Sequence, residues 1–565
     1  MSNIQVRKRN QTLFFAASGA FLCLTMACWI IPYRLYSGGG YYSFGYICDE
    51  YPYAVHLQPL CAGATINSPE NGIADPSVIS VYYLEDTCRN LLTVTDVNVV
   101  SFFWIWRVLF PPILGITSFI LARCCMSRRR PWSRQLQLAA GAAGMAWMYC
   151  AYPLLMPPPL RNYLERIPTN IEFILSMLFA CAYIRFLIKP EQWRMSLLAV
   201  AWLALAYLRP YAAMPWGAAA GLGTVWLLYS KRLSPKIFFV SVAFTAIAFS
   251  PAMIALWLNS HSVVAQQVFA RYFEAQPYRI HPRWYIQLLL AAGLWLGAFQ
   301  MKGPGRLFGI SCAIIMLLLP FTCALFPIGE QLMLHSDRLS FFYFPACLGV
   351  VMSMLGVRVE GWRGTGGALE SQRWGRRLSL AAYCSSALLC FQNTRSDLDE
   401  YRPGNYSAIV EDLHLIPSYE WVRDHTPPDA LFLVDDGFDW QHITKDEISK
   451  GIITTFWDKT ELFQVVARRR RIASELMFKN PLSTNDLQYL MGVQRGTLGY
   501  PFLSEKGYDN ALHHFQPDYI FWRRNLPIPR GFGVKLQPFS KIVHRDEFCE
   551  IWEMHFPASF REKGH

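Results

Sequence analysis

The chain has 565 residues, of which 53% are hydrophobic, 15% aromatic and only 16% charged, and its formal net charge is +12. This composition is too apolar for a soluble globular protein, and too often interrupted by charged stretches for a chain embedded throughout in a membrane. The basic residues gather in short clusters between apolar runs, which is typical of membrane topology and excludes nucleic acid as an expected partner.

Eleven apolar segments approach the length that crosses a bilayer, and two of them, 195–209 and 216–230, are short. Arg209-Pro210-Tyr211-Ala212-Ala213-Met214-Pro215 separates these two, which predicts one broken helix or a re-entrant pair. The sequence thus predicts a polytopic α-helical membrane domain at 1–392, with about eleven spans and a first outer loop at 36–100. The segments are 12–33, 101–125, 138–156, 171–189, 195–209, 216–230, 237–258, 284–300, 307–327, 339–357 and 378–392.

Short basic clusters orient these spans, because positively charged loops remain in the cytoplasm. If the spans alternate, five clusters fall on one side, and the N-terminus is then cytoplasmic. The loop that contains Asp49 and everything after residue 393 then lie outside the cytoplasm. The clusters are Arg7–Arg9, Arg128–Arg134, Lys231–Lys236, Lys302–Arg306 and Arg373–Arg377.

Residues 393–565 contain no further apolar span and alternate short helical and strand-like runs. Turn-then-strand patterns predict buried strands at 430–434 and 517–522, the first preceded by a helix that ends near His425. A terminal hairpin is predicted from Ile542–His544 and Cys549–Met554. We therefore expect a C-terminal extracytoplasmic α/β domain, in which Arg468–Arg471 form either a solvated face or a basic patch for lipid headgroups or an anionic substrate.

Two adjacent carboxylates, Asp49 and Glu50, stand in the first outer loop among aromatic residues. Paired acids can bind a divalent cation, or one can act as general base while the other orients it. The alternative is a solvated turn. Further acids at Asp75, Glu85 and Asp86 are alternative partners for Asp49 in place of Glu50.

Charged residues near the ends of the spans add candidates for the same site. Glu172 begins the fourth span, either at the mouth of a cavity or as a first-turn acid that complements the helix dipole. Arg107, Arg209 and Arg338 either face a cavity or extend to the interface. Arginines opposite a carboxylate pair would suit the cleavage of a lipid-phosphate-linked donor.

In these features the chain resembles the GT-C superfamily of polytopic glycosyltransferases, including members similar to dolichyl-phosphate-mannose mannosyltransferases. The resemblance rests on Asp49-Glu50-Tyr51-Pro52-Tyr53 in the first outer loop, on Leu208-Arg209-Pro210, and on Asp337-Arg338-Leu339 with Pro345. Glu172 and the segment Glu420–Ala430 also match in form, and bacterial members often carry a periplasmic α/β domain.

The resemblance implies an inverting glycosyltransferase of a bacterial inner (plasma) membrane. Its donor would be a sugar on a polyprenyl phosphate, and its acceptor an extracytoplasmic lipid, glycan or protein. Asp49 would be the base or would share Mg²⁺ or Mn²⁺ with Glu50, and Glu172 would be the second acid. The donor phosphate would meet Arg209, Arg338 and Arg107. The residues expected to line the substrate are Tyr51, Tyr53, Arg271, Tyr272 and His281, although tyrosines at this position also suit the aromatic belt of a membrane protein.

Other membrane functions fit the sequence less well. A transporter or lipid flippase usually shows two related halves, which the sequence lacks. A glycan polymerase or ligase places its large catalytic loop late, and an acyltransferase needs a histidine within a span. A non-catalytic subunit of cell-envelope glycan assembly is the remaining alternative.

Overall fold

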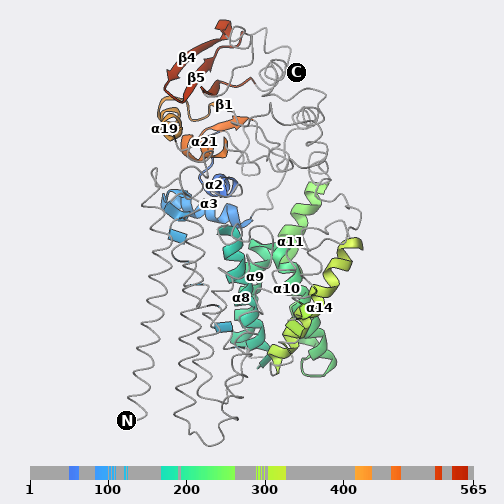
Figure 1. Cartoon of the computed structure of the whole chain (residues 1–565). Coiled ribbons are helices and arrows are strands. Elements are labelled where there is room, and N and C mark those ends of the chain that lie inside the picture. The colour runs from blue at the N-terminus through green and yellow to red at the C-terminus, as the bar shows by residue number, and fades with distance from the viewer. Residues whose placement is uncertain are drawn as a thin grey trace, which may run out of the picture. The chain divides into compact units, whose positions relative to one another are not determined.

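A computed structural model describes a part of the chain that forms two compact units (Figure 1). The helical unit comprises Met1–Ser37, Phe102–Ile254 and Tyr272–Arg402, and the α/β unit comprises Gly38–Ser101, Ala255–Arg271 and Pro403–His565. The described residues are 50–62, 83–99, 167–188, 192–260, 303–325, 414–434, 460–472, 516–524 and 537–557, with scattered positions at 101–124 and 288–298. The first loop is thus grouped with the C-terminal residues, whereas the predicted division at 392/393 groups it with the spans and stays a prediction.

Five of the predicted apolar segments form helices in the helical unit. They are α8 (Ile167–Ile188), α9 (Gln192–Leu208), α10 (Pro210–Tyr229), α11 (Pro235–Ser260) and α14 (Pro304–Leu325). The predicted segments 101–125 and 284–300 are described only at scattered positions, and 12–33, 138–156, 339–357 and 378–392 lie outside the described residues. The total of about eleven spans therefore stays a prediction.

Two of these helices are long and apolar enough to cross a membrane, at Asn170–Ile188 and Pro235–Ile254. In the second, large apolar side chains such as Phe239, Ile247 and Met253 are more than half exposed. An apolar helix with an exposed apolar surface is stable in lipid and not in water. The exposed surface of α11 therefore supports a membrane location for the helical unit.

Helices α8 and α9 form an antiparallel hairpin. The Phe179 ring of α8 meets the Trp202 ring of α9 with 5.0 Å between centroids. Nearer the turn, the Arg194 guanidinium donates to the Arg185 carbonyl oxygen at 3.0 Å. These contacts fix the register of the pair.

A second reversal joins α9 to α10 at Arg209. A Cβ added at Gly217 of α10 would lie 2.5 Å from the Trp202 indole of α9. In a continuous helix these two residues would stand about 22 Å apart, so the chain must fold back, and the two segments are not one broken helix. The predicted turn at 209–215 is wrong in extent. Helix α10 starts at Pro210, because the fixed φ of proline suits a first helical position.

Buried aromatic residues hold the helices together. The Tyr183 hydroxyl of α8 donates to the Ala220 carbonyl oxygen of α10 at 2.6 Å. Phe308 of α14 contacts Tyr183 with 4.9 Å between ring centroids and Trp216 with 6.3 Å. The core of the described helical unit thus includes side chains of α8, α9, α10, α11 and α14, the helices labelled in Figure 1.

The α/β unit contains a five-stranded sheet in the order β2-β1-β3-β5-β4. Strand β1 pairs in parallel with β2 and β3, while β5 pairs antiparallel with β3 and β4. Its described elements are α2 (Glu50–Leu57), α3 (Tyr83–Thr95), α19 (Ile416–His425), β1 (Leu431–Val434), α21 (Thr460–Ala467), β2 (Arg470–Ile472), β3 (Tyr519–Arg523), the 3₁₀ turn η5 (Gln537–Phe539), β4 (Ser540–Arg545) and β5 (Cys549–Met554).

The strands follow the pattern of their residues. All side chains of β1 and β3 are buried, as expected for central strands covered on both faces. Strand β4 stands at the edge and is largely exposed. The predicted strands near 430–434 and 517–522 and the terminal hairpin are confirmed.

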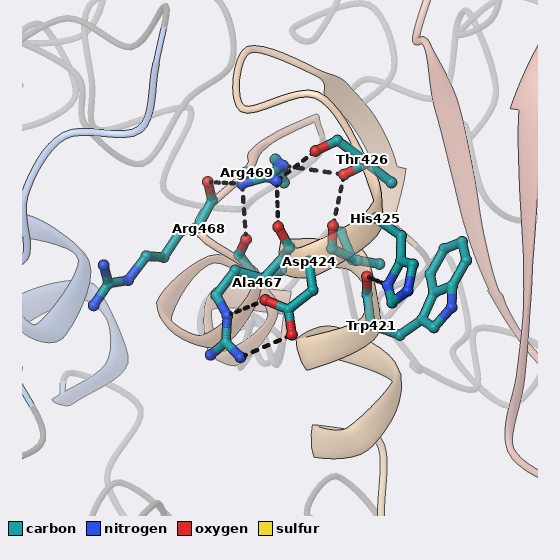
Figure 2. A network of polar contacts seen from close by, with 9 residues as sticks. Trp421, Asp424, His425, Thr426, Ala467, Arg468 and Arg469 are labelled. Atoms are coloured by element: carbon teal, nitrogen blue, oxygen red, sulfur yellow. Dashed lines mark hydrogen bonds and ion pairs between the residues drawn. The ribbon is translucent and has the colours of Figure 1, made fainter.

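The four consecutive arginines are not a solvated face. Arg469 and Arg471 are buried, and only Arg468 is exposed. The Arg469 guanidinium donates to the carbonyl oxygens of Arg423 and Thr426, both at 2.6 Å, and to the Thr426 hydroxyl at 3.0 Å. Figure 2 shows Arg469 beside Thr426. Arg469 therefore supplies hydrogen bonds to backbone carbonyls at the C-terminal end of α19, which lack partners within the helix. The solvated-face prediction is wrong for Arg469 and Arg471.

Candidate functional site

Glu172 is a buried carboxylate within a membrane-type helix, with only 2% of its surface exposed. Helix α8 begins at Ile167, five residues earlier, so Glu172 stands in the second turn, and the first-turn dipole interpretation is wrong. Asn170 and Ser176, close by on the same helix, are buried too. Ionisable side chains inside apolar helices are costly and usually functional.

Two contacts place Glu172 at the same level along the helices as Arg209. Phe179, seven residues after Glu172, meets Trp202, seven residues before Arg209. Tyr183, eleven residues after Glu172, meets Ala220, eleven residues after Arg209. Each residue advances a helix by about 1.5 Å, so both registers bring Glu172 level with the break at Arg209.

Glu172 also shares a helix face with these contacts. Residues spaced by seven and eleven positions lie on one side of an α-helix. Phe179 faces α9 and Tyr183 faces α10. The side of α8 that carries Glu172 is therefore the side turned toward α9 and α10, whose connection is Arg209.

The backbone at Arg209 leaves the helical conformation, with φ −142° and ψ 69°, and caps the start of α10. The residue is half-buried and its Nε atom is buried, which argues against a side chain that simply extends into solvent. The N-terminus of a helix also favours negative charge, because its first N–H groups are directed along the axis. A guanidinium beside such a helix start can hold a phosphate or a carboxylate.

The buried Asn170 Oδ1 has no hydrogen-bond partner among the described residues. An unsatisfied buried acceptor costs roughly 1–3 kcal/mol, and such atoms often belong to ligand sites. Asn170 was not predicted as a site residue. Its only signal was an uncharged polar residue two positions before the acid.

The acidic pair of the first loop is described only in part. Glu50 is the first residue of α2, and Tyr51 and Tyr53 follow in its first turn. The description does not extend to these three side chains or to Asp49. The predicted Mg²⁺ or Mn²⁺ site therefore stays a prediction.

Of the alternative first-loop acids, Asp86 serves the fold, because its carboxylate pairs with the Arg89 guanidinium at 3.0 Å. Glu85 is buried in the first turn of α3 and remains an alternative partner for Asp49. The other predicted site residues lie outside the described residues: Asp75, Arg107, Arg271, Tyr272, His281 and Arg338.

A second group of polar side chains, His544, Asp546 and Cys549, gathers at the β4–β5 turn, with ligand atoms within 4.8 Å of one another. Asp546 accepts hydrogen bonds from the Ser418 hydroxyl and from the amides of Phe548 and Cys549. Burial, which favours the neutral form, raises the pKa of the Cys549 thiol to about 12, and the thiol donates to Asp546. The carboxylate thus stabilises the turn, and the group needs no ion to explain it.

Comparisons with known proteins find a distant likeness among solved structures. No family model matches the chain, and no curated protein matches it. Among solved structures the chain is similar to the arabinofuranosyltransferase AftD from Mycobacteria, with 12% identity and a TM-score of 0.47. The likeness covers 97% of this chain but 40% of AftD, so the chain spans well under half the length of that protein. A TM-score below 0.5 does not establish a shared fold, and the site is therefore argued from this chain's own residues.

Proposed function

We propose that this protein is a membrane glycosyltransferase of the GT-C type, which moves a sugar from a polyprenyl phosphate to an extracytoplasmic acceptor. The observation that carries the proposal is the buried Glu172, level with Arg209 at the α9–α10 break. A carboxylate and a guanidinium at one level of a membrane helix bundle suit a reaction at a phosphate-bearing lipid. The proposal also uses the two carboxylates of Asp49 and Glu50, which are adjacent in the sequence of the first outer loop.

The reaction breaks one bond and forms another at the anomeric carbon. The acceptor hydroxyl oxygen attacks that carbon, the bond from the carbon to the phosphate oxygen breaks, and the configuration inverts. Asp49 takes the hydroxyl proton as general base, and the lipid phosphate departs as an anion. Because this leaving group is a stable anion, the reaction needs no strong general acid.

Each proposed side chain has one role. Arg209 neutralises the departing phosphate, with Arg338 and Arg107 as further candidates. Glu172 is the second acid, and it orients Arg209 or the sugar hydroxyls. Glu50 orients Asp49 or shares Mg²⁺ or Mn²⁺ with it. The substrate loop contains Tyr51, Tyr53, Arg271, Tyr272 and His281.

The test is a transfer assay with the purified full chain and a panel of synthetic polyprenyl-phosphate hexoses and pentoses, which include mannose. Release of polyprenyl phosphate is measured with Mg²⁺, with Mn²⁺ and with a chelator. We expect kcat to fall about 10²-fold or more in Asp49→Asn and in Glu172→Gln. Arg209→Met should lower kcat and also raise KM for the donor, because it removes the cation that neutralises the departing phosphate.

The matched control is Asp424→Asn. Asp424 is an exposed acid whose carboxylate pairs with its neighbour Arg423 at 2.9 Å, and surface pairs of this kind contribute little. Its activity should equal that of the unchanged protein. If Glu172→Gln keeps full activity, the proposed role of the buried acid is wrong. If the chain binds donors but releases no polyprenyl phosphate from any of them, a flippase or a non-catalytic subunit is favoured instead.

A further inference from the structure

Helix α2, which begins at Glu50, is too short to be stable by itself. It has eight residues, and isolated helices below roughly 12–15 residues are marginal in water. Ala54, Val55 and Leu57 of α2 are nevertheless fully buried. The conformation of α2 therefore depends on the elements that pack against it within the α/β unit.

One of these elements is the neighbouring helix α3. The Arg89 side chain of α3 donates from Nε to the His56 carbonyl oxygen of α2 at 2.7 Å. The same guanidinium pairs with Asp86 at 3.0 Å, which holds it in place. A cation at a helix C-terminus satisfies carbonyls that lack partners within the helix.

The other element lies four hundred positions further along the chain. The Gln58 side-chain amide, directly after α2, donates to the Gln464 carbonyl oxygen of α21 at 3.2 Å. Both residues are buried, at 3% and 0% exposed, and Figure 1 shows α2 beside α21. The sequence separation of this contact is 406 residues.

Gln464 is itself held on its other side. Its Oε1 accepts from the fully buried Arg471 of β2 at 3.1 Å, and its Nε2 points to the Cys61 sulfur at 4.0 Å. Burial raises the pKa of the Cys61 thiol against the opposing effects of Gln464 and nearby arginines. Cys61 is a free thiol, so no disulfide at this position holds the residues that follow α2. Arg471 of the sheet holds them instead, through Gln464.

We infer that the C-terminal residues of the α/β unit hold helix α2 in place, and that Gln58 is a positioning residue for Asp49 and Glu50. The inference rests on the proposed function, because it assigns the acids a reaction to be positioned for. Glu50 begins α2 and Asp49 precedes it in the sequence, so the anchor at the far end of α2 bears on where the helix begins. A misplacement of about 1 Å can cost roughly 10²-fold in rate.

The test variant is Gln58→Met, which keeps the size of the side chain and removes the amide donor. The Gln58 Oε1 has no partner among the described residues, so the substitution removes no hydrogen bond of that atom there. We expect kcat to fall about tenfold with KM for the donor unchanged. In an Asp49→Asn background the same substitution should have no further effect on kcat, because it acts through that acid.

Ser418→Ala is the matched control. It also removes a side-chain hydrogen bond of the α/β unit, a partly buried one to Asp546 at the β4–β5 turn and not to α2. Its kcat should be unchanged. If Gln58→Met lowers kcat equally in both backgrounds, or raises KM alone, the positioning role is wrong.

A second readout separates this inference from the proposed function. Amide hydrogen exchange of residues 50–57 should become at least tenfold faster in Gln58→Met, while exchange in β1 and β3 stays the same. If exchange in α2 is unchanged, the inference that Gln58 holds α2 in place is wrong, whether or not the chain transfers sugar. If exchange in α2 becomes faster but the unchanged protein turns over no donor, the anchoring of α2 by Gln58 is supported and the proposed function is wrong.

Discussion

At the scale of single residues, Arg468 and Arg469 are neighbours in the sequence with opposite surroundings. The Arg468 side chain is exposed, whereas the Arg469 guanidinium is buried and donates to five acceptor atoms of α19 and its own turn (Figure 2). Burial lowers the pKa of Arg469, but an arginine pKa lies far above neutral, so the group stays charged. A charged donor without acceptors would be costly there, and the five carbonyl and hydroxyl partners offset that cost.

Replacing Arg469 by alanine should therefore destabilise the α/β unit by about 2–4 kcal/mol, since buried acceptors lose a charged donor. The measurement is the unfolding free energy from amide exchange in β1 and β2 of the solubilised full chain. Arg468→Ala is the control and should change this value by less than about 0.5 kcal/mol. Equal effects of the two substitutions would contradict the assigned role of Arg469.

The same scale shows how far residue type alone can be interpreted. Glu172 was predicted as a site residue, and its role stays a prediction; its place in the second turn of α8 contradicts only the first-turn dipole alternative. The burial of Arg469 could not be predicted, because a run of four arginines gives no sign of which side chains the fold will enclose.

At the scale of elements, the α9–α10 reversal depends on a close approach. Gly217 faces the Trp202 indole where even a single methyl group would lie 2.5 Å from a ring atom. Only glycine leaves room for that ring without a shift. The reversal in turn brings Arg209 to the end of the hairpin, level with Glu172.

We predict that Gly217→Ala lowers the stability of the helical unit by about 1–3 kcal/mol through overpacking. Thermal unfolding in detergent should show a lower midpoint, and Trp202→Phe in the same chain should restore part of it. Gly221→Ala in the same helix is the control, because a Cβ there meets nothing within 4 Å. It should be neutral or slightly stabilising, since alanine favours a helix over glycine by about 0.5–1 kcal/mol. The interpretation fails if both variants behave alike.

At the scale of the whole molecule, membrane sidedness governs the proposed reaction. Residues after 393 are expected outside the cytoplasm, and the basic loop at Lys231-Arg232 inside it. The two units are joined by the chain at 37/38, 101/102, 254/255, 271/272 and 402/403. The lipid-linked donor and the outer acceptor must both reach the site from the same side.

A reporter that is active only outside the cytoplasm should therefore be active when fused after residue 393. The same reporter fused after Ser234, between α10 and α11, should be inactive, because that loop is predicted to be cytoplasmic. Activity is measured in intact cells, with equal expression checked by immunoblotting. Activity of the second fusion alone would reverse the predicted topology and would remove the outer acceptor from the proposal.

What the sequence determined by itself is local. Apolar stretches marked α8, α9, α10, α11 and α14, and turn-then-strand patterns marked β1 and β3, because hydrophobicity and turn residues act on neighbouring positions. Glu172 and Arg209 were each predicted as site residues because they are charged and lie near the ends of spans, but nothing in the sequence linked the two.

Only the tertiary structure decided which residues from distant parts of the chain lie close together. The level shared by Glu172 and Arg209 depends on two helix registers, and the anchor of α2 depends on a contact across 406 residues. Such contacts are set by how whole helices and sheets pack to bury apolar surface. The residues that meet are far apart in the chain, so local sequence patterns do not show which residue contacts which. The chemistry of the candidate site was therefore visible in the residues, and its geometry was not.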